Sequence, residues 1–108
     1  MKIKLKLTPD QLTKLNTLMS KIDEVYKPDT MEGKAIKSIS YGITDKIHNK
    51  YLKLQRSLGL FSQNETIRYE LAYHEAFALF KILNAILGVK PDHDLQTVHN
   101  FIHQKIIV

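Results

Sequence analysis

The distribution of apolar residues along the chain predicts a protein made of helices. Apolar side chains recur at spacings of three and four residues over four segments, and this is the period of an amphipathic helix. We expect helices near residues 9–26, 30–58, 63–87 and 91–105. Short connections make antiparallel neighbours the default arrangement. The pattern therefore predicts an all-α protein, an antiparallel four-helix bundle.

Signals for the start of a helix support these boundaries. Pro9, Pro28 and Pro91 each precede an aspartate. Proline suits the first helical position, and an acidic neighbour meets the positive end of the helix dipole. Thr8 and Ser62 are followed three residues later by glutamine or glutamate, which is the spacing of a capping box. The segments 9–26 and 63–87 are thus expected to begin with capped first turns.

Two features depart from a plain bundle. Gly42 lies among β-branched residues inside the segment 30–58, and glycine costs about 1 kcal/mol relative to alanine in a helix. A break there would give five helices. Both ends are strand-like: residues 2–7 alternate Lys with Ile or Leu, and residues 106–108 are all β-branched. The two ends would pair as a small ribbon, or the N-terminal strand would join a partner's sheet or remain disordered.

Composition narrows the class of protein. A length of 108 residues, an apolar fraction of 44% and a charged fraction of 25% are typical of one globular domain. We therefore expect a single helical domain over residues 1–108. No uncharged apolar run approaches the ~20 residues that span a bilayer, and the start lacks a signal-peptide core. The absence of cysteine favours a cytoplasmic protein without a disulfide framework.

The positive charge is concentrated in the first part of the chain. Residues 1–60 contain twelve Lys and Arg against six Asp and Glu, within a net charge of +5. The candidate binding residues in the segment 30–58 are Lys34, Lys37, Lys46, Lys50, Lys53 and Arg56. Lys46, Lys50 and Lys53 would form one ridge along a helix, which can follow a phosphate backbone. The alternative is a solvated face that keeps the protein soluble.

Two charges interrupt the apolar side of the segment 63–87. On a helical wheel, Arg68 and Glu75 both fall inside the apolar arc, whereas His74 lies on the polar side. A buried charge is costly unless it is paired. We expect the partner of each to come from another helix of the bundle or from a second chain, and a second chain would favour a functional role.

Arg68 and His74 also carry a resemblance to a known family. Their spacing in Arg68-Tyr-Glu-Leu-Ala-Tyr-His74 resembles the loose Arg-to-His motif of the HEPN family of small helical proteins. The resemblance covers seven residues and the helical fold class. It implies a ribonuclease that uses the pair across a dimer interface. His74 would then act as general acid or base, and Arg68 would hold the scissile phosphate.

A second pair of residues would suit a metal. His99 and His103 are separated by four residues, which places both imidazoles on one face of a helix. A third ligand would have to come from another part of the chain. The alternative is that His99, which borders the apolar stripe, is packed and hydrogen-bonded, and we expect no cofactor.

The pattern as a whole favours a small protein that binds rather than catalyses. We expect it to dock on a protein or nucleoprotein partner, RNA or DNA, through a basic helical surface, and it could be an inhibitor from a phage or mobile element. A HEPN-like ribonuclease or its inactive relative is the second hypothesis. A structural bundle that forms a homodimer is the third.

Overall fold

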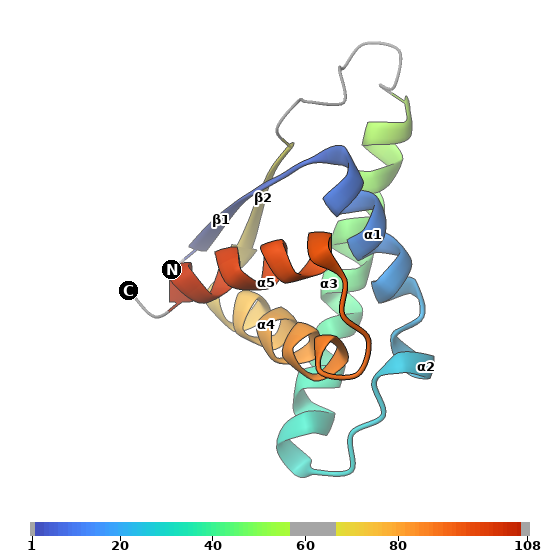
Figure 1. Ribbon diagram of the computed structural model, residues 1–108, viewed down its shortest axis with the longest axis vertical. Helices are drawn as coiled ribbons and strands as arrows, with labels where there is room; N and C mark the ends of the chain where they lie inside the picture. Colours follow the sequence, from blue (N-terminus) through green and yellow to red (C-terminus); the bar gives the residue numbers. More distant parts are fainter. Residues whose placement is uncertain (1, 57–66, 107–108) are drawn as a thin grey trace.

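The computed structural model describes residues 2–56 and 67–106 and is mostly helical with a small sheet (Figure 1). The expected all-helical bundle is therefore not confirmed, although the helical majority is. The elements follow in the order β1 (Lys2–Leu7), α1 (Pro9–Ser20), α2 (Ile22–Val25), α3 (Met31–Arg56), β2 (Ile67–Ala72), α4 (Tyr73–Leu87) and α5 (His93–Ile106).

The main correction concerns the start of the segment 63–87. Residues Ile67–Ala72 form a strand rather than the first turns of a helix, and this strand pairs antiparallel with β1. Strand-like character at the N-terminus is confirmed, but the partner of β1 is β2 and not the C-terminal end. Ser62 and its expected capping box lie outside the described residues, as do residues 57–58 and 107–108.

The alternation of side chains explains why these two segments pair. Every second residue of β1 is buried, and Tyr69 and Leu71 of β2 are buried on the same side. The register places Ile3 opposite Leu71 and Leu5 opposite Tyr69. The inner face of the sheet is consequently apolar and completes the core.

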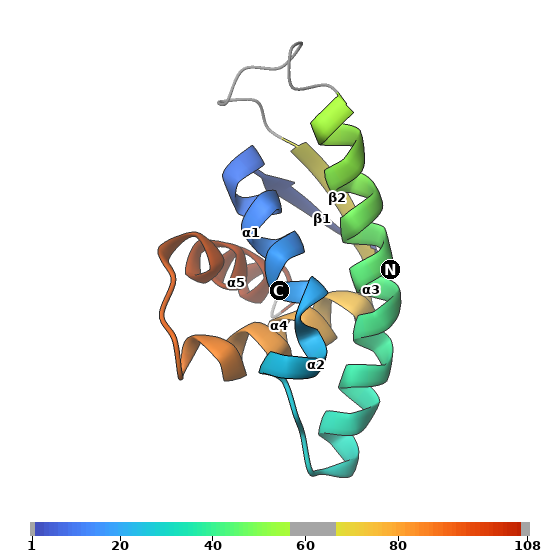
Figure 2. The same cartoon turned by 90° about the vertical axis from the view of Figure 1, so that its right-hand side faces the viewer.

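Helix α3 sets the length of the molecule, because its 26 residues span about 39 Å of the 44 Å long axis (Figure 2). Helices α1 and α4 pack on α3, and α5 packs on α4, α1 and β1. The core between them contains the fully buried side chains of Leu12, Leu15, Met19, Ile43, Ile47, Leu79, Ile82, Leu83 and Ile102. Within the described ranges, no helix is long and apolar enough to cross a membrane.

The breaks between helices differ from those expected. The segment 9–26 is divided into α1 and α2 at Lys21, whereas α3 runs without a break through Gly42.

The capping box at the start of α1 is confirmed. The Thr8 hydroxyl accepts a hydrogen bond from the Gln11 N–H at 3.2 Å, and the Thr8 N–H donates to the Gln11 side chain at 2.9 Å.

Replacement of Gly42 by alanine is expected to stabilise the protein. A methyl group at Gly42 would meet no heavy atom within 4 Å, and alanine favours the helix by about 0.5–1 kcal/mol. The midpoint of thermal unfolding, followed by circular dichroism, should rise by about 3–6 °C. Gly33→Ala is the matched control and should lower it, because the added carbon would collide with Pro28.

Candidate functional site

The outer face of the two-stranded sheet carries only charged side chains along most of its length. Because Ile3, Leu5, Leu7, Tyr69 and Leu71 point inward, the residues between them point to solvent. We call this outer surface the basic sheet face, and it comprises Lys2, Lys4, Lys6, Arg68 and Glu70. Pairing thus brings together cations from two segments that lie some sixty residues apart.

The basic sheet face has one cross-strand pair of opposite charges and one of like charges. Lys4 faces Glu70, and the Lys2 ammonium lies 3.4 Å from the Glu70 carboxylate. At the other end, Lys6 faces Arg68 directly. Like charges in this position destabilise an antiparallel pair. Among the residues of known placement, no carboxylate forms an ion pair with Lys4, Lys6 or Arg68.

A hollow accompanies this concentration of charge. It has a volume of about 460 Å³ and is lined by Lys4, Leu5, Lys6, Arg68, Tyr69 and Glu70. Three of the four charged residues in its wall are cations, so the hollow has a net positive charge.

Lys46 of α3 satisfies the buried carboxylate of Glu75. Its ammonium lies 2.8 Å from both carboxylate oxygens, and the Ala72 N–H donates to one of them at 3.0 Å. Burial alone would raise the pKa of Glu75, but these hydrogen bonds and the positive charge of Lys46 outweigh it and lower the pKa. The partner of Glu75 is therefore a residue of the same chain, which is one of the two alternatives that the sequence left open.

Helix α3 uses two flanks for different neighbours. Thr44 and His48 make their contacts with α1, whereas Lys46 reaches the junction of β2 and α4. Lys50 and Lys53 follow Lys46 at helical spacing, so the three lysines lie on one flank of α3.

The remaining predicted cations of α3 are dispersed. Lys37 pairs with Asp23 at 3.3 Å on the flank that faces α2. Lys34 and Arg56 are exposed near opposite ends of the helix. The structure therefore groups Lys46, Lys50 and Lys53 as expected, but not all six residues.

Arg68 and His74 lie on different elements. Arg68 is exposed on β2, and His74 is exposed in the first turn of α4. The helical wheel that placed Arg68 on the core side does not apply, because a strand turns its side chain outward. The ribonuclease hypothesis stays a prediction.

His99 and His103 stack on an aromatic ring. Their ring centroids lie 4.7 and 5.2 Å from that of Phe80. Nδ1 of His99 also lies 3.2 Å from the side-chain oxygen of Asn100. Over residues 2–56 and 67–106, no group of three or more potential metal ligands is found. His99 is partly buried and His103 is exposed, and both rings stack on Phe80, while a metal at this pair stays a prediction.

Sequence reasoning missed Lys2, Lys4 and Lys6 as members of a site. The alternation that exposes them was visible, but the strand that places Arg68 beside them was not. Comparison with known proteins adds no candidate, because no protein-family model, curated protein or solved structure matches this chain.

Proposed function

We propose that this protein binds nucleic acid, without catalysis, through the basic sheet face and the flank of α3 that carries Lys46, Lys50 and Lys53. The observation that carries the proposal is the cross-strand pairing of Lys6 with Arg68, next to Lys4, with no carboxylate paired to these three cations in the described parts of the chain. Lys6 and Arg68 repel each other in the free protein. A phosphate bound between them would remove this repulsion and form hydrogen bonds with both cations.

The chemistry of the surface favours contact with phosphates over the reading of bases. Lysine supplies a compact charge, and the guanidinium of Arg68 can bind two phosphate oxygens at once. The outer positions of the sheet present no aromatic ring on which a base could stack. We therefore propose that binding depends weakly on sequence and strongly on salt. Inhibition of a nucleoprotein, and an origin in a phage or mobile element, stay predictions.

Charge reversal at three positions tests the proposal. We expect Lys4→Glu, Lys6→Glu and Arg68→Glu, combined, to weaken binding to a labelled single-stranded RNA or duplex DNA of about 20 nucleotides by at least about 100-fold. The slope of log K against log salt on duplex DNA should become shallower by about 3, because roughly 0.9 is lost with each phosphate contact. Fluorescence anisotropy between about 50 and 200 mM salt measures both quantities.

The matched control changes the net charge by the same amount elsewhere. It combines Lys21→Glu, Lys27→Glu and Lys90→Glu, three exposed lysines outside the sheet. We expect its affinity to stay within about threefold of the wild type, apart from the long-range effect of net charge. Equal losses in both triple variants, or no binding by the wild-type protein, would reject the proposal.

Two single variants separate binding from stability. Lys6→Glu places a carboxylate opposite Arg68 and should stabilise the fold by about 0.2–1 kcal/mol. Lys4→Glu places a second carboxylate opposite Glu70 and should destabilise it by a similar amount. Both should weaken nucleic-acid binding by about tenfold. Thermal unfolding and anisotropy on the same samples check this, and a binding loss that followed stability would contradict it.

A further inference from the structure

A second surface feature lies at the other end of the molecule from the sheet. An open groove of about 750 Å³ runs between α1 and α2 on one side and the end of α4 and start of α5 on the other. Its walls are rich in apolar side chains: Leu18, Val25, Tyr26, Pro28, Ala85, Ile86, Val89 and Leu95. In both views α2 and the end of α4 lie away from the sheet (Figures 1 and 2).

Several of these apolar side chains are more exposed than their chemistry favours. Val89 is 87% exposed and Val25 is 43% exposed, at opposite walls of the groove. Leu18 and Ile86 are only partly buried between them. A continuous apolar surface of this kind is typical of an interaction site.

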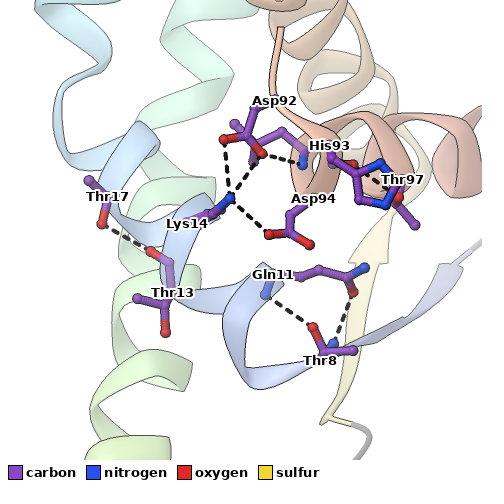
Figure 3. A network of polar contacts seen from close by, with 10 residues as sticks. Thr8, Gln11, Thr13, Lys14, Thr17, Asp92, His93, Asp94 and Thr97 are labelled. Carbon is purple, nitrogen blue, oxygen red and sulfur yellow. Dashed lines mark hydrogen bonds and ion pairs between the residues drawn. The ribbon is translucent and has the colours of Figure 1, made fainter.

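The lysines at the groove fall into two groups. The ammonium of Lys14 lies 3.3 Å from Asp92 and 2.8 Å from Asp94, so its charge is neutralised within the fold (Figure 3). Lys21 and Lys27 on one wall and Lys90 on the other pair with no carboxylate in the parts of the chain that the structure describes. The groove is thus apolar inside, with lysines on both walls.

Asp92, which also lines the groove, is engaged within the fold. One of its oxygens accepts from the Leu95 N–H at 3.1 Å and so caps α5, while Lys14 occupies the carboxylate (Figure 3). The capping hydrogen bond and the positive charge of Lys14 lower the pKa of Asp92. Asp92 therefore links α1 to α5, and Lys21, Lys27 and Lys90 leave the groove with a net positive charge.

We propose that the groove binds an acidic amphipathic helix of a partner protein. An apolar stripe along such a helix matches the groove interior, and Glu or Asp on either side of the stripe meets the lysines on both walls. The groove is open along the surface, which suits a helix lying in it better than a small ligand enclosed by it. This inference does not depend on nucleic-acid binding, and the separation of the two surfaces lets both be occupied together.

A designed peptide serves as the probe. We use a labelled helical peptide of about 18 residues with Leu and Phe at positions i, i+3, i+4 and i+7 and Glu elsewhere. Two matched peptides accompany it, one with Lys in place of Glu and one with the same residues scrambled. Anisotropy with the full chain should show that the acidic amphipathic peptide binds at least about tenfold more tightly than either control.

A charge swap locates the site. The variant combining Lys21→Glu, Lys27→Glu and Lys90→Glu should lose at least about tenfold in affinity for the acidic peptide and gain affinity for the Lys peptide. The variant combining Lys4→Glu, Lys6→Glu and Arg68→Glu should bind the acidic peptide within about threefold of the wild type. This reciprocal pattern separates failure at the groove from failure at the sheet.

Three outcomes would overturn the inference. They are equal binding of the scrambled peptide, equal losses in both triple variants, and tight binding of dodecanoate with no binding of any peptide. The last would identify the groove as a site for an anionic acyl chain. Val89→Glu gives a further check. The side chain of Val89 is highly exposed, so the substitution should leave the protein folded. The new carboxylate should nevertheless weaken binding of the acidic peptide by about tenfold.

Discussion

Tyr69→Ala is expected to lower the free energy of unfolding by about 3 kcal/mol, whereas Arg68→Ala should change it by less than about 0.5 kcal/mol. Tyr69 is only 8% exposed, on the inner face of the sheet, and its removal leaves a cavity against the core. Arg68 is exposed on the outer face. Neighbouring residues therefore have very different effects because β2 is a strand.

Urea unfolding followed by circular dichroism measures both variants. Tyr69→Phe is the conservative control and should cost little, because the buried Tyr69 hydroxyl has no hydrogen-bond partner among the residues placed by the structure. Burial and the nearby carboxylate of Glu75 raise the pKa of Tyr69, so the hydroxyl stays protonated in the folded protein. A large loss for Arg68→Ala together with a small one for Tyr69→Ala would indicate a helix over these residues.

Loss of the Lys46 ammonium is expected to destabilise the protein by about 2 kcal/mol. The side chain of Glu75 is 9% exposed, and Lys46→Ala leaves its carboxylate with the Ala72 N–H as its one partner among the described residues. Lys50→Ala, one turn further along the same flank, is the matched control and should have little effect. Thermal and urea unfolding compare the two, and equal losses would show that the ion pair contributes nothing specific.

The same pair predicts a dependence on pH. The pKa of Glu75 is lower in the folded protein than its ordinary value of 4.5, so the ionised carboxylate favours folding. This contribution is present above pH 4.5 and is lost as the pH falls through the lowered pKa. Glu75→Gln should therefore lose less stability than the wild type between neutral pH and acid. Asp92 also has a lowered pKa and retains its share of the acid sensitivity in both proteins.

Local patterns predicted much of the fold. The Thr8 capping box, the apolar face of α3 and the alternation of β1 depend on residues that are close in sequence, and all three are present. The strand β2 was missed because no glycine, proline or asparagine separates it from α4. Ala72 ends the strand and precedes the helix, and its N–H is capped by Glu75. An apolar run without a turn residue was therefore assigned to one helix.

The candidate site was predictable only in part. Helical spacing placed Lys46, Lys50 and Lys53 on one flank, because that geometry is local. The basic sheet face depends on the register of two distant segments, which a single sequence does not specify. The ion pair between Lys46 and Glu75 is likewise a tertiary contact. Cations that share a helix face could thus be recognised, whereas cations that share a sheet could not.

The distance along the chain between β1 and β2 has a consequence for folding during synthesis. The ribosome releases β1 long before residues 67–72 emerge, and until then Ile3, Leu5 and Leu7 have no strand to pair with. An unpaired apolar strand is prone to associate with other chains. Lys2, Lys4 and Lys6 alternate with these residues and repel a second copy of the strand. We therefore expect the cations that we propose to bind phosphate to reduce aggregation of the nascent chain as well.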